Sequence, residues 1–502
     1  MKKAFVLLIL SISLAICLTA CDWQLAFGWL IDCDEPIDHT HKFGEWSVTE
    51  RPTSTKEGLQ ERICSCGERE SETIAKLPAG YSVGLDYKLN EDGQSYSVSG
   101  IGDCTDRILV ISPVYNELPV TKIDNGAFYG RKNLTRVVIP DSVVSIGDFA
   151  FNYCISLTDI EIPDGVTSIG RNAFDYCRGL TKIVIPDSVV SIGSSAFYEC
   201  KYIRDVYISD LDVWCNIPFG NQYSSPMYYG ADLHLNGELV TEPVIPDNVT
   251  SIGAAFCGCT SIVSVTIPSG VKSIEKQAFS GCKNISEVYI SDMDAWYDIS
   301  FGDYSSNPLC YGADLYLNGE LVSELVIPDT VTSIRSLVFY GCASLTRVVI
   351  PDSVTHIGDY AFSDCTGLAS IVIPDSVTSI DHGAFADCDS LAYNEYDNAY
   401  YLGNDLNPYL VLVKAKDTSI TSCEIHPDTR FIHSWAFYDC EALMSVVIPG
   451  GIVSIGAYSF ADCDALADVY YAGTEEEWKK IDRPYNYNDI LNRIAIHYSY
   501  AP

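Results

Sequence analysis

Short segments in which apolar and polar residues alternate recur along most of the chain. In residues 157–162 the alternation places Ile160 and Ile162 on one face of an extended segment, and this period of two predicts a short strand. Pro163 follows at once, and because proline lacks an N–H group, it ends the strand where the chain has to turn. One such strand cannot bury its own apolar face, so the pattern predicts that these segments stack on one another.

The segments belong to a repeat. Its unit reads I-P-D-x-V-x-S-I-x-x-x-A-F-x-x-C-x-x-L-x-x-[IV]-x-I, and self-similarity at such a period is typical of a solenoid. Stacking these units side by side completes a parallel sheet, with Val166, Ile169 and Phe174 in one interior layer. Within each group of units the prolines stand 22 or 23 residues apart, at Pro140, Pro163 and Pro186, at Pro246 and Pro268, at Pro328, Pro351 and Pro374, and at Pro427 and Pro449.

The unit resembles the leucine-rich repeats of BspA-like bacterial surface proteins, whose pattern is I-P-x-x-V-x-x-I-G-x-x-A-F-x-x-C-x-x-L. The resemblance covers roughly residues 100–471. It implies an α/β leucine-rich-repeat solenoid of short parallel strands, with irregular or short helical segments on the other side. It also implies a protein of the bacterial cell surface.

We expect six parts along the chain. They are a lipoprotein signal peptide at 1–20, a membrane-proximal linker at 21–38, a small His/Cys-containing module at 39–80, an N-terminal cap at 81–117, repeats at 118–471 and a C-terminal cap at 472–502, with inserts at about 209–243, 291–325 and 394–423. The first two inserts are copies of each other and carry Asn236-Gly237 and Asn318-Gly319. Asn-Gly between apolar runs predicts a tight hairpin, so we expect β-hairpin flaps that project from the solenoid.

The N-terminal sequence predicts an export signal. Lys2 and Lys3 precede an apolar run from Ala4 to about Ala15, and Leu-Thr-Ala-Cys follows at residues 18–21. This end resembles the lipobox of bacterial lipoproteins, which implies that Cys21 becomes the first residue of the mature chain and carries diacylglycerol on its sulfur. Because two or more acyl chains make a stable anchor, the resemblance implies an extracellular protein that is lipid-anchored to a bacterial membrane. A plain signal peptide with an incidental cysteine is the alternative.

Half of the 20 cysteines occupy one position of the repeat. Neighbouring strands lie about 5 Å apart, which permits disulfides between adjacent repeats. Cysteine also packs well as a small apolar residue, and an unbroken row offers no unique pairing. We therefore expect buried, reduced thiols at Cys154, Cys177, Cys200, Cys259, Cys282, Cys342, Cys365, Cys388, Cys440 and Cys463.

The module at 39–80 combines histidines with a Cys-x-Cys pair, and it resembles short His/Cys modules that precede such repeats in other surface proteins. His39, His41, Cys64 and Cys66 offer the side chains that zinc prefers, although their spacing departs from that of common zinc sites. We favour a small β-fold held by packing or by one disulfide. We expect no cofactor, with zinc at these four residues as the alternative.

Composition and motifs argue against two classes of function. The 31 Lys+Arg and 67 Asp+Glu residues give a formal net charge of −36, and such a chain is a poor partner for phosphates, which argues against nucleic acid. The G-x-S-x-G match at residues 80–84 follows a polar linker and leads into a strand-like segment, whereas a nucleophile elbow needs a strand before it and a helix after it. We predict that the protein is not an enzyme and name no catalytic residue.

A binding function rests on side chains that point out of the predicted sheet, because an exposed apolar stripe marks an interaction surface. Strand propensity alone also places β-branched residues at such positions. Where Trp-containing segments cover Tyr207, Tyr289 and Tyr470, these tyrosines belong to the core instead. The candidate ligand-binding residues are Arg136, Val138, Lys182, Val184, Arg347, Val349, Val372 and Val447.

Two hypotheses follow. The first is an adhesin-like surface protein that binds host or bacterial proteins, host matrix proteins among them, as the resemblance implies. The alternative is a carbohydrate-binding or structural component of the cell envelope, because the 33 Tyr and seven Trp can stack on sugars. Trp214 and Trp296 are the tryptophans expected to serve this alternative.

Overall fold

The computed structural model describes residues 41–77, 79–483 and 488–501. The proposed signal peptide, Cys21 and His39 lie outside these residues. Residues 41–50 and 58–74 belong to a first compact unit, whereas 51–57 and the residues from 75 onward form a second. None of the helices in the described part of the chain has the length and apolar character needed to cross a membrane.

The first unit is a three-stranded antiparallel sheet. Its strands are β1 (Ser47–Glu50), β2 (Gly58–Ile63) and β3 (Arg69–Ile74), in the order β1-β2-β3. The Arg62 guanidinium lies 4.5 Å from the centre of the Trp46 ring and 5.0 Å from that of Phe43. These cation–π contacts and the strand pairing give the small unit its order.

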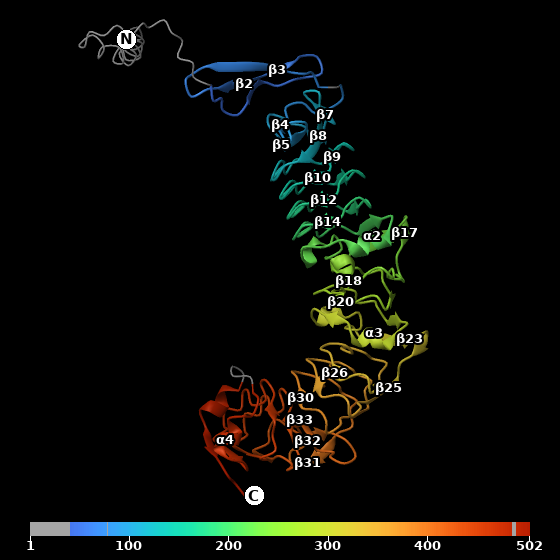
Figure 1. Ribbon diagram of the computed structural model, residues 1–502, viewed down its shortest axis with the longest axis vertical. Helices are drawn as coiled ribbons and strands as arrows, with labels where there is room; N and C mark the ends of the chain where they lie inside the picture. The colour runs from blue at the N-terminus through green and yellow to red at the C-terminus, as the bar shows by residue number, and fades with distance from the viewer. Residues whose placement is uncertain (1–40, 78, 484–487, 502) are drawn as a thin grey trace, which may run out of the picture. The chain divides into compact units, whose positions relative to one another are not determined.

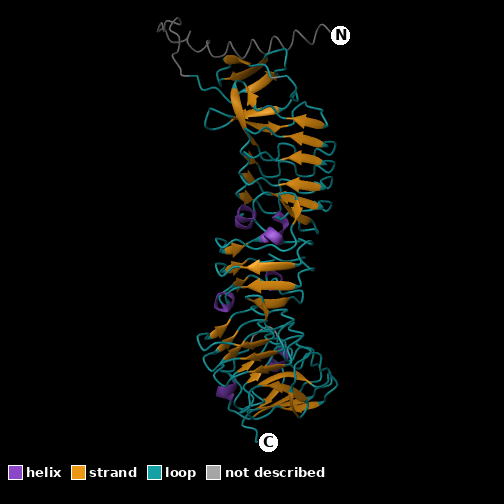
Figure 2. Ribbon diagram, turned by 90° about the vertical axis from the view of Figure 1, so that its right-hand side faces the viewer, coloured by secondary structure: helices purple, strands orange, loops and turns teal. Residues whose placement is uncertain are grey.

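The second unit is a solenoid in which each regular repeat contributes two strands (Figures 1 and 2). Each strand pairs in parallel with the equivalent strand of an adjacent repeat, as Ser145, Ser168 and Ser191 do. The first row comprises β6 (Ile108–Val110), β9 (Arg136–Val138), β11 (Asp159–Glu161), β13 (Lys182–Val184), β15 (Asp205–Ile208), β16 (Asp232–Leu235), β19 (Ser264–Ile267), β21 (Glu287–Ile290), β23 (Asp314–Leu317), β25 (Glu324–Val326), β27 (Arg347–Val349), β29 (Ser370–Val372), β34 (Ser422–Glu424), β36 (Ser445–Ile448), β38 (Asp468–Tyr471) and β39 (Ala495–His497). The second row comprises β8 (Leu118–Ile123), β10 (Ser145–Ile146), β12 (Ser168–Ile169), β14 (Ser191–Ile192), β18 (Ser251–Ile252), β20 (Ser273–Ile274), β22 (Ser300–Phe301), β26 (Ser333–Ile334), β28 (His356–Ile357), β30 (Ser379–Ile380), β33 (Val411–Ala415), β35 (Phe431–Ile432) and β37 (Ser454–Ile455). The predicted leucine-rich-repeat solenoid of short parallel strands is thus confirmed.

The interior is continuous from repeat to repeat. Phe151, Phe174 and Phe197 are buried, and the Phe174 ring stacks on both of its neighbours at centroid distances of 5.4 Å. Val166 and Ile169 are buried in the same layer, as the repeat pattern predicts. No repeat therefore has a separate core, and each one relies on its neighbours for burial.

Turns rather than long helices connect the second row back to the first. Phe149 and Tyr153 adopt φ angles of 57° and 60°, and their N–H groups donate to the carbonyls of Arg171 and Asp175 in the next repeat, each at 2.8 Å. Because these bonds run between repeats, the turn side carries its own ladder of backbone hydrogen bonds.

All ten cysteines of the repeat row are buried, as expected, and no disulfide joins one to another. Cys154 and Cys177 donate to the carbonyls of Phe128 and Phe151, at 3.2 and 3.1 Å. Burial raises the pKa of the Cys154 thiol to about 12. The row thus adds weak hydrogen bonds between repeats and stays protonated at neutral pH.

The first two inserts are not the projecting flaps we expected. Asp232 of β16 pairs in parallel with Asp205 of β15, so the insert contains a complete divergent repeat that continues the first row. The Trp214 side chain fills this repeat's interior, 1% exposed, and its Nε1–H donates to the Ala255 carbonyl at 2.9 Å. Only the Asn236-Gly237 turn and the strand after it form the predicted hairpin.

The remaining elements complete the two divergent repeats, the third insert and the ends. In the divergent repeats they are α2 (Leu211–Asn216), η1 (Gln222–Ser224), β17 (Glu238–Leu239), α3 (Met293–Tyr297), η3 (Tyr304–Ser306) and β24 (Glu320–Leu321), and η2 (Ala254–Phe256) follows the first. The N-terminal end has β4 (Asp86–Leu89), β5 (Tyr96–Gly100) and β7 (Val114–Tyr115), the third insert has β31 (Asn394–Tyr396) and β32 (Ala399–Leu402), and the C-terminal end has α4 (Glu475–Trp478) and η4 (Asp489–Asn492).

Candidate functional sites

The first row presents one side of its strands to solvent, and the predicted ligand-binding residues lie there. Arg136, Lys182, Val184 and Arg347 are exposed, and the other four are half-buried. Parallel pairing at β25, β27 and β29 aligns Val326, Val349 and Val372 in one row. Val326 is 70% exposed, and we name these three side chains the valine row.

The structure does not join the remaining predicted residues into the same row. Val138 pairs with Glu161, Val184 with Tyr207, and Val447 with Glu424 and Tyr470. Polar and aromatic neighbours therefore interrupt the stripe that the sequence predicted.

Val326 was not predicted as a candidate. It precedes Pro328 by the usual two residues, but its strand begins inside the segment that we assigned to the second insert. The Ile-Pro signal was therefore present and only the insert boundary concealed it.

Arg136 is paired across the strands. Its Nε lies 3.0 Å from Asp159 Oδ2 on the next strand, and both side chains are about half exposed. Such surface pairs contribute little to stability, but this pair leaves Arg136 less available as a positive contact for a partner.

The three outward tyrosines, two at the divergent repeats and Tyr470 near the C-terminal end, are half-buried rather than part of the core. Tyr207 stacks on His234 at 4.6 Å, and Tyr470 stacks on His497 at 4.7 Å. In each pair the histidine Nε2 also lies within 3 Å of an aspartate oxygen, on Asp205 or Asp468. The side chain that covers each of these tyrosines comes from the next strand of the first row, because the tryptophan of the following helix is buried in the interior instead.

An aromatic platform lies on the turn side of the C-terminal repeats. We give this name to the rings of Tyr360, His382, Trp435 and Tyr458. The His382 and Trp435 centroids are 4.1 Å apart, and the Trp435 and Tyr458 rings are almost parallel at 6.2 Å.

Gly383 makes room for this platform. Its φ is +65°, and a Cβ there would lie 2.6 Å from Cε1 of Tyr360 and 3.3 Å from Cζ3 of Trp435. The two rings approach each other across the position where other repeats carry a side chain.

A break in the hydrogen-bond ladder opens a groove beside the platform. The Phe385 N–H donates to Nε2 of His433 at 3.4 Å instead of to a carbonyl, and Nδ1 of His433 donates to the Ser434 carbonyl at 3.1 Å. The imidazole is buried, which lowers its pKa to about 4. The groove has a volume of about 400 Å³, and Asp387, Asp389 and Lys414 line it.

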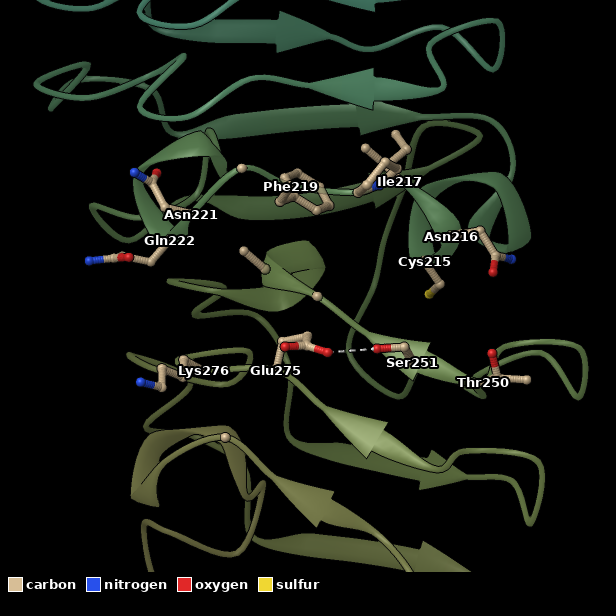
Figure 3. A pocket seen from close by; sticks show the side chains of 15 residues that line it. Cys215, Asn216, Ile217, Phe219, Asn221, Gln222, Thr250, Ser251, Glu275 and Lys276 are labelled. Atoms are coloured by element: carbon tan, nitrogen blue, oxygen red, sulfur yellow. Dashed lines mark hydrogen bonds between the residues drawn. The ribbon is translucent and has the colours of Figure 1, made fainter.

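A larger groove of about 690 Å³ lies where the first divergent repeat meets the next regular one (Figure 3). Glu275 and Lys276 supply the charges of its lining, and the Ser251 hydroxyl donates to Glu275 at 3.2 Å. Burial raises the pKa of the Cys215 thiol to about 12, so this lining cysteine is a poor nucleophile at neutral pH. The groove is a consequence of the change in repeat type.

The first unit brings together three of the four proposed zinc ligands. The ligand atoms of His41, Cys64 and Cys66 lie within 4.8 Å of one another, and this is the one such His/Cys/Asp/Glu group within residues 41–77, 79–483 and 488–501. Hydrogen bonds to the Cys64 sulfur, from the Cys66 N–H above all, lower the pKa of this thiol to about 6. Both cysteines are free of disulfides. The small β-fold that we expected is present, and no disulfide joins Cys64 to Cys66.

A comparison with protein families matches a BspA type leucine rich repeat region, in six copies, to residues 121–218, 235–307, 312–405 and 415–492. These residues make up more than half of the chain. The chain belongs to the BspA-type leucine-rich repeat family. No curated protein matches it.

Solved structures of bacterial repeat proteins resemble this BspA-type chain. A leucine rich cell surface protein from Faecalibacterium prausnitzii is 27% identical over 80% of this chain and 97% of its own, with a TM-score of 0.45. A leucine-rich repeat protein from Bacteroides ovatus is 22% identical over 83% and 98%, with a TM-score of 0.44. The pneumococcal vaccine antigen PcpA is 16% identical over 83% and 98%, with a TM-score of 0.37.

Proposed function

We propose that this BspA-type protein is an adhesin-like binding protein of the bacterial surface that recognises host or bacterial proteins through the valine row. The observation that carries the proposal is the alignment of Val326, Val349 and Val372 on neighbouring strands. Repeat solenoids typically use such extended faces for binding. Val326 is 70% exposed beside the two half-buried valines, and an exposed apolar side chain in such a row favours an interface that a partner covers.

Charged side chains border the valine row. Glu324 and Arg347 are exposed and stand opposite each other in the same register. Interfaces between proteins commonly combine an apolar centre with a polar rim, and this arrangement has both. The acidic balance of the chain also disfavours a nucleic-acid partner.

The surface location is part of the proposal and rests on the N-terminal export signal. The lipobox-like end supports lipidation of Cys21. Metabolic labelling with radioactive palmitate in the native host should label the wild-type chain and not Cys21→Ser. Equal labelling of both chains would refute the anchor and leave the binding proposal intact.

A binding panel tests the function. Purified wild-type chain is passed over immobilised extracellular-matrix proteins and over glycans. The triple variant Val326→Asp, Val349→Asp and Val372→Asp should lose at least roughly tenfold in affinity for the protein that wild type binds, because each carboxylate would be desolvated without a partner. The matched control carries Val144→Asp and Val190→Asp, which replace exposed valines outside the valine row, and should bind as wild type does. Unchanged affinity of the triple variant would refute the proposal.

The aromatic platform supports a second function, namely carbohydrate binding. Trp214 and Trp296 cannot serve it, because both side chains are 1% exposed and their N–H groups are bonded to carbonyls. Trp435, beside the groove with its two aspartates, has the apolar ring and nearby polar groups that a sugar requires. Trp435→Ala should abolish binding on the glycan array. Tyr129→Ala replaces an exposed ring elsewhere and should keep this binding. Glycan binding that survives in Trp435→Ala would exclude this site.

A further inference from the structure

The first unit places three soft metal ligands around one point. An antiparallel bridge joins Phe43 to Cys64, and the Gly44 N–H donates to the Ile63 carbonyl at 3.1 Å. This pairing holds the segment before β1 alongside the turn that connects β2 to β3. His41 thereby reaches Cys66, with Nδ1 3.2 Å from Sγ.

The turn itself aligns the two cysteines. The Cys64 N–H donates to the Glu68 carbonyl and the Gly67 N–H to the Cys64 carbonyl, both at 2.8 Å. Gly67 has φ +93°, a conformation that residues with a Cβ seldom adopt. This closed turn holds the sulfur atoms of Cys64 and Cys66 near the same point, within the 4.8 Å that spans all three ligand atoms.

We propose that His41, Cys64 and Cys66 bind a zinc ion in the first unit. Tetrahedral zinc with its usual bond lengths separates two sulfur ligands by about 3.8 Å and a sulfur from a nitrogen by about 3.6 Å, and the group fits within the observed spread after small shifts. Two thiolates and an imidazole favour zinc over the hard cations Ca²⁺ and Mg²⁺.

Zinc also gives the first unit a source of stability. Its sheet has only three short strands, and Cys64 and Ile74 are among its few buried apolar residues. Units this small commonly rely on a metal or on disulfides. This inference is independent of the proposed binding function, because it concerns residues of the first unit alone.

Zinc analysis of the purified full chain tests the site. After exposure to Zn²⁺ alone and extensive dialysis, elemental analysis should find a single zinc ion per wild-type chain and a loss of that ion in Cys66→Ser and in His41→Ala. Both of these side chains are exposed and lie outside the solenoid, so the variants should keep the circular dichroism signal of the folded solenoid. Cys104→Ser, at a cysteine outside the group, is the matched control and should keep the metal.

Co²⁺ provides a second readout. Replacing zinc with Co²⁺ should give thiolate-to-metal charge-transfer absorption in the near ultraviolet, which weakens in Cys66→Ser and persists in Cys104→Ser. Wild-type zinc content equal to that of Cys66→Ser and His41→Ala, or a Cys64–Cys66 disulfide found by peptide mapping in the freshly isolated protein, would overturn the proposal.

Discussion

Replacing Phe174 with alanine tests whether the repeats share one interior. The Phe174 ring is fully buried between the rings of Phe151 and Phe197, and Phe→Ala in a core costs about 3–5 kcal/mol. The cavity cannot collapse easily, because the Phe174 N–H donates to the Ala196 carbonyl at 2.8 Å and ties this repeat to the next. The two lost ring contacts add to the cost, so we expect a value near 4–5 kcal/mol, at the upper end of that range.

Guanidinium unfolding followed by far-ultraviolet circular dichroism and by tyrosine fluorescence measures this cost. Solenoids can unfold in segments, so the affected transition is the one that contains the repeats around Phe174. Tyr129→Ala is the control, because this ring is 56% exposed, and it should change the unfolding free energy by about 0.5 kcal/mol or less. If Phe174→Ala costs no more than Tyr129→Ala, the shared interior does not exist.

Three further predictions concern single positions. The folded pKa of His433 is about 4 against 6.5 for the free side chain, so the unfolded state takes up the proton first, and the free energy of unfolding should fall by roughly 3 kcal/mol from this group as pH drops from 7 to 4. His433→Gln should show a correspondingly flatter pH dependence in urea melts, and an identical slope would refute the buried neutral imidazole. Because burial raises the pKa of Cys177 well above its usual value, Ellman's reagent at pH 8 should label the repeat-row cysteines only after denaturation, and labelling of Cys177 in the native chain would contradict the packing. A Cβ at position 383 would meet the Tyr360 ring, so Gly383→Ala should lower the unfolding free energy by about 1–2 kcal/mol and shift Trp435 fluorescence. Unchanged fluorescence would contradict the ring packing of the aromatic platform.

The fold could be predicted from the sequence because its signal is repeated. Ile160, Pro163 and Phe174 each recur at the same offset in nearly every repeat, and a wrong assignment at one copy is corrected by the others. The divergent repeats lack this redundancy. There Trp214 replaces the usual interior residues, and its surroundings in the sequence indicate an insert rather than another layer of the solenoid.

The sites could be predicted only in part. Alternation identified the outward positions of the first row, so Val349 and Val372 were predicted, but the interruption of the stripe depends on register between strands that no local pattern contains. The platform joins Tyr360 to Trp435 across Gly383, and these residues are far apart in sequence because the third insert lies between them. Likewise, His41 and Cys66 meet through antiparallel pairing that a motif with irregular spacing does not predict.

Hydroxyl-radical footprinting of the bound chain tests the central claim most directly. The matrix protein captured on the panel is added, and oxidation of exposed side chains is read by mass spectrometry with and without it. We predict that Val326, Val349 and Val372 become protected while Val190 and Trp435 remain as reactive as in the free chain. Protection of Val190, or of Trp435 in place of the valine row, would contradict the account.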